Sequence, residues 1–289
     1  MAAQWGGDRH GHILRAGDSP AKTGRSSPVV NARGPPMSIY PHCHDGRRAM
    51  VTGAASGIGR AAAVSLAATG AHVLAVDMNQ EGLDALAAEV PNIEGVRCDL
   101  SKLEEIQQLP TDIDILVNNA GIQTVSPIEE FPVERFELIM RVMLHAPWYL
   151  IRQSLPHMYE KGWGRVINVS SAHGLRASEF KSAYVTAKHG LEGLSKVVAL
   201  EGGPRGVTSV TINPAYVRTA LVEKQIAEQA KAHGMSEDEV VAKIMLDRVH
   251  VKRLIEPEEV GELVAFLTGP ASASMSGTSY PIDGAWSAY

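Results

Sequence analysis

Short apolar runs alternate along most of the chain with longer segments whose apolar residues recur with helical spacing. From residue 48 onward the short runs predict strands at residues 48–51, 72–76, 94–98, 114–117, 164–169, 207–212 and 278–282. The longer segments predict helices at residues 60–69, 81–89, 131–159 and 257–267, a short helix within 101–113 and a helix that begins near residue 182. Strands that alternate with helices predict an α/β fold with a doubly wound parallel sheet, whose ligands bind at the carboxyl ends of the strands.

The first 47 residues differ from the rest of the chain. They are rich in Gly, Pro, Ser, His and Arg and follow neither helical nor strand periodicity. We therefore predict a disordered N-terminal extension over residues 1–47 and a single domain over residues 48–289. The extension is compatible with an organelle transit peptide or with a later start at Met37. Its histidines and cysteine at residues 42–44 lack a second cluster to complete a ligand set, so we predict no metal site.

The charge and the cysteine content indicate which kinds of partner and which cellular compartment to expect. The formal net charge of −5 and the isoelectric point near 6.1 argue against nucleic acid or an anionic membrane as a partner. Two cysteines, Cys43 and Cys98, cannot form a disulfide framework, and no apolar run is long enough to span a bilayer. We expect a cytoplasmic protein with no membrane partner.

A glycine-rich segment with the sequence TGAASGIG joins the first strand to the first helix at residues 52–59. Its glycines let the backbone turn tightly and approach a diphosphate at a helix N-terminus. This predicts a dinucleotide site with contacts from Gly53, Ser56, Gly57, Ile58 and Gly59. The next strand ends in Asp77, where a carboxylate suits the ribose hydroxyls. Because Asp77 would repel a 2′-phosphate and neither Ser56 nor Met78 carries a positive charge, we predict NAD rather than NADP.

Two further strand ends add polar or small residues to the same edge of the sheet. Asp99 and Leu100 follow the third strand, where Asp99 suits the adenine edge of a dinucleotide. Asn119, Ala120 and Gly121 follow the fourth strand. We expect all five residues to contact the cofactor.

A tyrosine and a lysine stand four residues apart at the start of the helix near residue 182. On a helix this spacing places Tyr184 and Lys188 on one face. A phenol titrates near pH 10, and an ammonium group within reach lowers that pKa by roughly 1 to 3 units. Ser171 follows the strand over 164–169 and can fold back toward the phenol. We predict Ser171, Tyr184 and Lys188 as catalytic residues, with proton transfer through Tyr184.

These motifs, together with NNAG at residues 118–121, YVTAK at residues 184–188 and the pair Asn213 and Pro214, resemble the short-chain dehydrogenase/reductase family over residues 48–289. The resemblance implies a Rossmann-type fold and a nicotinamide-dependent interconversion of an alcohol and a ketone. It implies that Tyr184 exchanges the substrate proton, that Ser171 orients the substrate oxygen and that Lys188 holds the nicotinamide ribose. It also implies cofactor contacts from Tyr184, Lys188, Pro214, Val217 and Thr219.

One position departs from the family pattern. The long helix usually carries an asparagine of the proton relay, and Met143 stands there in this chain. A thioether cannot donate a hydrogen bond as an amide does. Pro147 lies four residues further on and leaves the carbonyl of residue 143 without its N–H partner, so we expect that carbonyl to bind a relay water. The alternatives are a merely kinked helix and a slow enzyme, or a catalytically impaired NAD-binding sensor.

Within the family, four segments resemble the bacterial D-3-hydroxybutyrate dehydrogenases: residues 119–123, residues 171–175 with 181–184, residues 213–219 and residues 221–226. The resemblance implies a substrate pocket formed by Gln123, Ser171, His173, Lys181, Tyr184, Tyr216 and Gln225. Lys181 precedes Tyr184 by three residues and shares its helical face, and one cation among neutral donors suits a small carboxylate. Tyr216 replaces the tryptophan usual in the family, which leaves the length and polarity of the substrate open.

Residues 219–250 are longer than a connection requires and have a helical pattern with a capping box at residues 236–239. They predict a lid that closes over bound ligand and positions Gln225. The helix over 131–159 is apolar on nearly every side, which predicts a second covered face and therefore a homo-oligomer, with a homotetramer as the expected form.

Together these features predict an NAD-dependent oxidoreductase for a small 3-hydroxy acid and its 3-keto acid, of the type that acts in ketone body metabolism. A dehydrogenase for a polyol, another hydroxy acid or a 3-oxoacyl substrate is the alternative within the same class. Asp77 argues against the last of these, because 3-oxoacyl reductases usually prefer NADP.

Overall fold

The computed structural model describes residues 40–288, and within them seven parallel strands form one sheet. The order across the sheet is β3-β2-β1-β4-β5-β6-β7. The strands are β1 (Arg48–Thr52), β2 (His72–Asp77), β3 (Ile93–Arg97), β4 (Ile115–Asn118), β5 (Gly164–Val169), β6 (Val207–Pro214) and β7 (Ser279–Ile282). All seven predicted strands are confirmed, and their bounds differ from the prediction by two residues at most.

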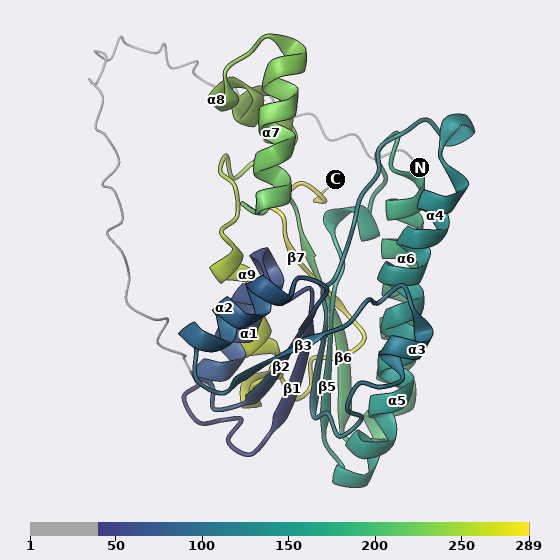
Figure 1. The fold of residues 1–289 in the computed structure, drawn as a ribbon, viewed down its shortest axis with the longest axis vertical. Coiled ribbons are helices and arrows are strands. Elements are labelled where there is room, and N and C mark those ends of the chain that lie inside the picture. The colour runs from purple at the N-terminus through teal and green to yellow at the C-terminus, as the bar shows by residue number, and fades with distance from the viewer. Residues whose placement is uncertain (1–39, 289) are drawn as a thin grey trace, which may run out of the picture. The chain divides into compact units, whose positions relative to one another are not determined.

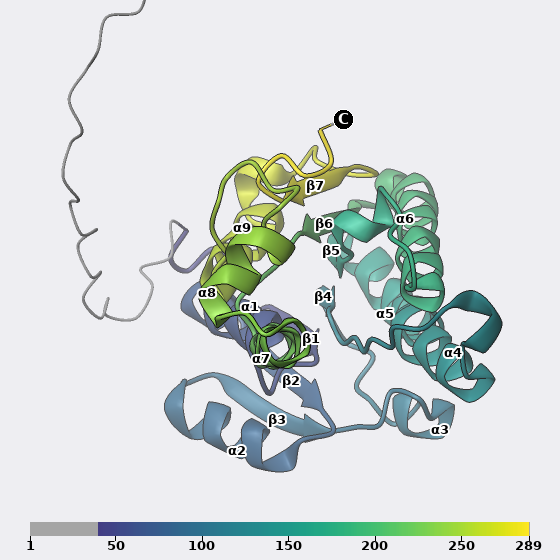
Figure 2. The same ribbon diagram turned by 90° about the horizontal axis from the view of Figure 1, so that it is seen from above.

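Helices cover both faces of this sheet (Figure 1, Figure 2). One face carries α1 (Gly57–Ala68), α2 (Gln80–Glu89) and α9 (Pro257–Thr268). The other face carries α3 (Leu103–Ile106), α4 (Val133–Met140), α5 (Ala146–Lys161) and α6 (Ser182–Gly202). Beyond the carboxyl ends of the strands stand α7 (Ala220–His233) and α8 (Glu237–Val240). The predicted doubly wound α/β fold is confirmed, and no helix within residues 40–288 could cross a membrane.

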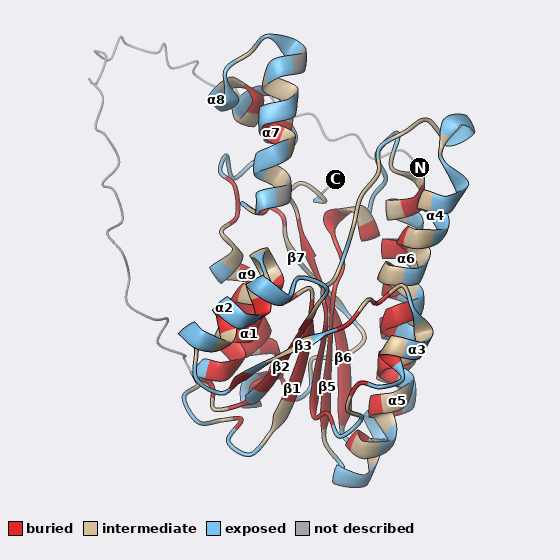
Figure 3. Ribbon diagram, in the orientation of Figure 1, coloured by how far each residue is buried: buried red, intermediate tan, exposed pale blue. Residues whose placement is uncertain are grey.

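Apolar layers on both faces hold the sheet in place. Strands β4, β5 and β6 are buried along their whole length (Figure 3). Leu66 of α1 and Val264 of α9 belong to one apolar cluster, and Leu116 of β4 and Leu150 of α5 belong to another. Burial of one such side chain contributes about 1.5 to 3 kcal/mol, so these layers fix the positions of the strand ends.

The carboxyl ends of β1 and β4 mark the point where the chain changes direction across the sheet. After β1 the chain continues toward β2 and β3, and after β4 it continues toward β5 and β6. Connections that leave neighbouring strands in opposite directions open a crevice, which is where α/β sheets bind their ligands. The glycine-rich segment follows β1 and residue 119 follows β4, so the fold brings both to this crevice.

The predicted long helix is a single helical run that contains one π-helical turn. The helix α4 continues into a π turn at Arg141–His145 and then into α5, and the N–H of Ala146 donates to the carbonyl of Arg141. Pro147 has no N–H to donate, so the regular hydrogen-bond pattern is interrupted here. The run covers residues 133–161, within two residues of the prediction at each end.

The predicted boundary of the N-terminal extension is wrong for residues 40–47, which form turns that lead into β1. His44 is only 1% exposed, and its Nε2 lies 3.0 Å from Oγ1 of Thr268. Since the Thr268 hydroxyl donates to the carbonyls of its own helix, the imidazole must be the donor in this contact. A single buried side chain among turn residues leaves no periodicity that sequence analysis could detect. Residues 1–39 of the predicted extension lie outside the described residues.

The buried His44 predicts a stability that falls in acid. Burial, followed by the charges of Arg47 and Arg165, lowers the pKa of His44 from 6.5 to about 4. Between these values the unfolded chain binds more protons than the folded chain, so stability falls as the pH drops from about 6.5 toward 4. The measurement is the free energy of unfolding by urea titration at pH 7 and at pH 4.5. From pH 7 to pH 4.5 this free energy should fall in both proteins, and the fall should be roughly 2 kcal/mol smaller in His44→Gln than in the wild type.

The matched control for this prediction is His42→Asn. The His42 side chain is exposed, and its φ of 65° is one that asparagine tolerates. We expect the control to keep the pH dependence of the wild type. The same pH dependence in all three proteins would contradict a neutral, buried His44.

Candidate functional site

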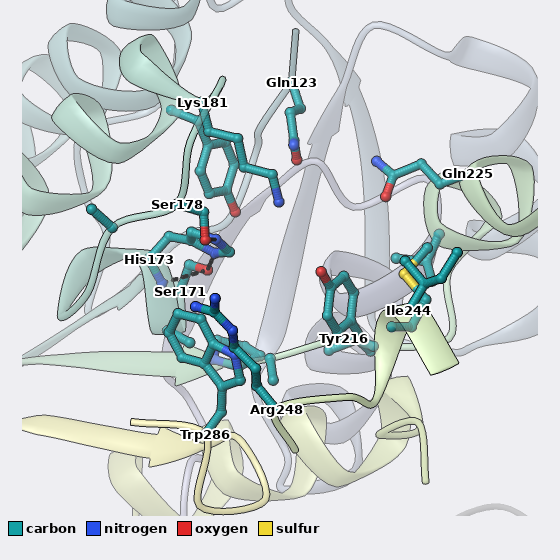
Figure 4. A pocket seen from close by; sticks show the side chains of 18 of the residues that line it. Gln123, Ser171, His173, Ser178, Lys181, Tyr216, Gln225, Ile244, Arg248 and Trp286 are labelled. Atoms are coloured by element: carbon teal, nitrogen blue, oxygen red, sulfur yellow. Dashed lines mark hydrogen bonds between the residues drawn. The ribbon is translucent and has the colours of Figure 1, made fainter. Parts of the chain in front are cut away.

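A pocket of about 660 Å³ opens at the carboxyl ends of β5 and β6 (Figure 4). Its wall is formed by the turn after β5, the start of α6, the loop after β6 and the segment that contains α7 and α8. All seven residues predicted to hold the substrate line this pocket: Gln123, Ser171, His173, Lys181, Tyr184, Tyr216 and Gln225. The fold therefore gathers these side chains from distant parts of the sequence into one cavity.

The hydroxyl groups of Ser171 and Tyr184 are neighbours in this pocket. The backbone N–H of His173 donates to Oγ of Ser171 at 3.1 Å, and Nδ1 of the same residue lies 3.4 Å from that oxygen. The other ring nitrogen lies 2.8 Å from Oγ of Ser178. Ser171 forms a hydrogen bond with Tyr184, whose ring meets the imidazole edge-on at 6.0 Å between centroids. Burial lowers the pKa of His173 to about 4, so the imidazole is neutral near pH 7.

Lys188 lies one turn after Tyr184 on α6 and is 4% exposed. Its ammonium group donates to the carbonyl of Val169 at 2.6 Å and lies 5.6 Å from the centroid of the Tyr184 ring. Burial lowers the pKa of Lys188 to about 8, while the charge of Glu192 acts to raise it. Burial raises the pKa of Tyr184 and the hydrogen bond with Ser171 acts to lower it, so the net shift is opposite to the lowering predicted from Lys188.

The glycine-rich segment packs against the residues that follow β4. Gly53 and Gly57 have φ values of 67° and 54°, in the left-handed region that favours glycine. A Cβ on Gly59 would lie 2.1 Å from the carbonyl oxygen of Gly53, so no larger residue fits there. The side-chain amide of Asn119 donates to the carbonyl of Thr52 at 2.9 Å. These contacts build a backbone cradle at the N-terminus of α1, where a diphosphate could bind.

The other predicted cofactor contacts surround this cradle. Ser56 precedes the first residue of α1, and Ala120 donates its N–H to Oγ1 of Thr52 at 3.1 Å. Gly121 follows directly and lies beside the side chain of Met143. The remaining contacts line the pocket itself: Ile58, Tyr184, Pro214, Val217 and Thr219.

Asp77 and Asp99 lie at the carboxyl ends of β2 and β3. The Asp77 carboxylate accepts hydrogen bonds from the N–H groups of Ala55 at 3.1 Å and Asn79 at 3.0 Å. Asp99 accepts from the N–H and the hydroxyl of Ser101 at 2.9 and 2.7 Å. Burial acts to raise the pKa of Asp99, but these hydrogen bonds hold it below its usual value. The neighbouring Leu100 is buried.

Donor groups converge on the pocket from three parts of the chain (Figure 4). The amino group of Lys181, just before α6, is directed into the cavity, as are the amide groups of Gln123 and Gln225. Burial lowers the pKa of Lys181, and its amino group has no hydrogen bond or ion pair within residues 40–288. The hydroxyl of Tyr216 adds a further polar group to the same cavity.

Sequence analysis missed several residues that line the pocket, among them Ser178, Arg248 and Trp286. The indole of Trp286 lies 5.3 Å from the imidazole of His173 between ring centroids. These residues lie in irregular segments, whose place is set by tertiary packing rather than by local pattern. Only the long insertion over 219–250 gave a signal, because it predicted a lid near the site.

Met143 occupies the position where the family usually has asparagine. It is 1% exposed, and its Sδ accepts a hydrogen bond from the N–H of Ile122 at 3.5 Å. Ile122 directly precedes Gln123, so the thioether helps to hold the segment that carries this amide. The binding of a relay water by the Met143 carbonyl stays a prediction.

We expect Met143→Asn to change turnover by less than about tenfold, or about 1.4 kcal/mol of activation free energy. The physical reason is that Met143 already holds the Ile122 N–H and that the interrupted helix offers a carbonyl for the relay water. Initial rates of nicotinamide reduction provide the measurement. Met143→Leu is the matched variant: it leaves the partly buried N–H of Ile122 without its acceptor and should lower stability by about 1 kcal/mol. A gain of several orders of magnitude in Met143→Asn would contradict the relay through the carbonyl.

Comparison with known proteins identifies the family. Residues 47–230 match the family described as short chain dehydrogenase, and the chain belongs to this family. It is therefore an oxidoreductase of the class that uses a nicotinamide cofactor. The resemblance inferred from the glycine-rich segment, Ser171, Tyr184 and Lys188 is confirmed.

Relatives within this family carry different names. A D-beta-hydroxybutyrate dehydrogenase of Rhizobium meliloti (strain 1021) is 43% identical over 258 residues, which cover 84% of this chain and 99% of that protein. An L-xylulose reductase of Mesocricetus auratus is 35% identical over 243 residues, which cover 83% of this chain and 96% of that protein. Among solved structures, a 2-deoxy-d-gluconate 3-dehydrogenase from Agrobacterium tumefaciens with bound NADP matches with a TM-score of 0.77 and 31% identity. The match covers 86% of this chain and 99% of that one.

Proposed function

We propose that this protein interconverts a small 3-hydroxy acid and its 3-keto acid with NAD, in the manner of 3-hydroxybutyrate and acetoacetate. The observation that carries the proposal is the partly desolvated amino group of Lys181 beside the amides of Gln123 and Gln225, in the pocket of Ser171 and Tyr184. A substrate carboxylate would accept hydrogen bonds from all three donors, and charge-assisted hydrogen bonds are roughly twice as strong as neutral ones. The name of the Rhizobium meliloti relative supports the same substrate class.

The residues at the crevice fit a nicotinamide dinucleotide. A Cβ at Gly53 would collide with Ala120 and Asn119, and a Cβ at Gly59 would collide with the carbonyl of Gly53, so only glycine allows the backbone cradle in which a diphosphate would bind. When bound, the cofactor supplies the carbon that accepts a hydride from the substrate carbinol. Asp77 would accept hydrogen bonds from the adenosine ribose and would repel a 2′-phosphate. The Agrobacterium tumefaciens neighbour holds NADP, so the proposal of NAD rests on Asp77.

The geometry supports a direct role for each of the three predicted catalytic residues. The Tyr184 phenolate would take the proton of the substrate hydroxyl during oxidation and return it during reduction. Oγ of Ser171, held by the N–H of His173, would orient the substrate oxygen. Lys188, anchored on the carbonyl of Val169, would hold the nicotinamide ribose and place a positive charge near the phenol. Because burial raises the pKa of Tyr184, the phenolate forms mainly on the alkaline side.

We further propose that residues 219–250 act as a lid. The helix α7 carries Gln225 at the pocket, and the predicted capping box at Ser236 and Glu239 is present at the start of α8. Movement of this segment toward α6 would exclude water and bring Gln225 to a bound carboxylate.

We also propose a homo-oligomer, with a homotetramer as the expected form. Trp148 of α5 is 46% exposed, and Val197 and Leu200 of α6 are 50% and 79% exposed. These two helices pack side by side, so a partner subunit would cover their apolar residues together.

A polyol is the second candidate substrate. The hydroxyl of Tyr216 adds a polar group where the family usually has tryptophan, and the Mesocricetus auratus relative is named for a sugar. From a different class, a catalytically impaired NAD-binding sensor is the candidate that Met143 favours. Ser171 and Tyr184 line one pocket and Lys188 lies one turn after Tyr184 on α6, and this complete set argues for an active enzyme.

We expect Lys181→Met to raise the KM for 3-hydroxybutyrate at least about tenfold and to leave the KM for NAD unchanged. The physical reason is that a hydrogen bond to a charged group contributes about 1.5 to 3 kcal/mol. Initial rates of NADH formation provide the measurement. Lys196→Met, which removes an exposed lysine on the same helix, is the matched control and should behave as the wild type.

A substrate panel completes this experiment. It contains both enantiomers of 3-hydroxybutyrate, longer 3-hydroxy acids and polyols, each with NAD and with NADP. A preference for a polyol, or an unchanged KM in Lys181→Met, would contradict the proposed carboxylate site. Complete inactivity of a folded protein that binds NADH would favour the sensor.

We expect the wild type to have a higher kcat/KM with NAD than with NADP, and Asp77→Ser to reduce this preference at least tenfold, equivalent to about 1.4 kcal/mol. The variant removes the negative charge that would face a 2′-phosphate. The measurement is kcat/KM for each cofactor at saturating substrate. Asp84→Ser, which removes an exposed carboxylate on α2, is the control and should keep the preference. A wild type that prefers NADP would refute the assignment of NAD.

A further inference from the structure

Glu192 is a buried carboxylate to which the chemistry above gives no role. It lies on α6, one turn beyond Lys188 and on the same face, and is 6% exposed. Its Oε1 accepts a hydrogen bond from Nδ2 of Asn213 at 2.6 Å. Its Oε2 accepts from the hydroxyls of Thr211 and Ser279, each at 2.7 Å. All three partners donate, an arrangement that suits an ionised carboxylate, which can only accept.

A buried negative charge requires compensation, and hydrogen bonds alone provide only part of it. Within the part of the chain that the structure describes, no side-chain nitrogen of Lys, Arg or His lies within 4 Å of the Glu192 carboxylate oxygens, so Glu192 forms no ion pair there. Lys188 and Glu192 are the two charged residues that α6 buries. They stand four residues apart, the spacing at which opposite charges on a helix attract each other.

The carboxylate is also connected to the catalytic serine. The same Nδ2 of Asn213 that donates to Glu192 donates to the backbone carbonyl of Ser171 at 3.0 Å. Glu192 therefore fixes the orientation of the amide that holds the turn after β5. Glu192 thus lies one helical turn from Lys188 and is linked to the backbone of Ser171 through the Asn213 amide.

Other titratable groups around this part of α6 do not replace Glu192. His173 and Tyr184, which lie on the pocket side of Lys188, are neutral near pH 7. Lys181 is directed into the pocket, and His145 on the π turn is exposed. Six further charged or titratable groups on α6 and on the elements packed against it have partners other than Lys188 and Glu192: Arg135 with Thr124, Arg141 with Glu137, His157 with Asp114, Arg165 with the carbonyls of Gly164 and Gly206, His189 with the carbonyl of Val185, and Arg205 with the ring of Tyr159.

We propose that Glu192 is a positioning residue of the active site: its buried carboxylate keeps Lys188 charged and, through Asn213, fixes the backbone of Ser171. This role rests on the proposed contact of Lys188 with the nicotinamide ribose and does not depend on which alcohol the enzyme oxidises. The pKa of Lys188 is about 8 because burial lowers it and Glu192 raises it. Without Glu192, Lys188 loses its proton at a lower pH and with it the charge that would hold the nicotinamide ribose.

The test is the pH dependence of NADH binding to Glu192→Gln, followed by the fluorescence of NADH. This variant keeps the size of the side chain and removes its charge. We expect the alkaline midpoint at which affinity is lost to move down by at least about one pH unit. Binding at pH 8 would then weaken about fivefold, while binding at pH 6 would change little. The binding measurement needs no substrate, so its outcome is independent of the proposed 3-hydroxy acid.

Two further variants separate charge from structure. Glu192→Asp withdraws the carboxylate by one methylene, so its alkaline midpoint of NADH binding should move in the same direction as in Glu192→Gln but by a smaller amount. This variant provides the test if Glu192→Gln does not fold. Ser279→Ala removes one hydrogen bond from Glu192 and leaves its charge, so its midpoint should match the wild type. An unshifted midpoint in the folded Glu192 variants, or an equal shift in Ser279→Ala, would overturn the proposal and leave Glu192 as a structural group.

Discussion

The hydrogen bond from the ammonium group of Lys188 to the carbonyl of Val169 couples the catalytic helix to the sheet. Val169 is the last residue of β5, and Ser171 follows in the turn that leaves the strand. Tyr184 lies one turn before Lys188 on α6, so the 2.6 Å contact fixes the phenol relative to the serine. Parallel strands bring their carboxyl ends to one edge, and this edge is where the glycine-rich segment also lies. The relative positions of Ser171, Tyr184 and Lys188 thus follow from the docking of one helix on one strand.

The elements and most of the site could be predicted because their signals are local. The strand over 164–169 begins at a glycine, contains Val166, Ile167 and Val169 and is followed by two serines, and the structure has it at the predicted bounds. The glycines at 53, 57 and 59 and the Tyr184–Lys188 spacing each express a geometric requirement within a few residues. The predicted substrate residues converge for the same reason, since each follows a strand end or opens a helix at the same edge of the sheet.

The features that sequence analysis missed depend on groups that are distant in the chain. The burial of His44 brings its imidazole to Thr268, which lies 224 residues further along the chain. The pKa of Tyr184 moves upward because surrounding elements exclude water, which outweighs the effect expected from its neighbour on the helix. The carboxylate of Glu192 has its partners on β6 and β7, so helical position alone gave no indication of its contacts. The relatives in this family are named for different compounds, so the family motifs alone do not determine the substrate.

Trp286, near the carboxyl end of the described residues, belongs to the wall of the pocket. Trp286 faces His173, and the guanidinium group of Arg176 donates to the carbonyl of Ser287 at 3.0 Å. Asp283 accepts from the N–H groups of Ala285 and Ser287, each at 3.0 Å, and so closes this segment on itself. An affinity tag fused at the carboxyl terminus would therefore disturb the turn that forms this wall of the pocket. Among the described residues, the first that lines the pocket is Ile58, so a purification tag is better placed at the amino terminus.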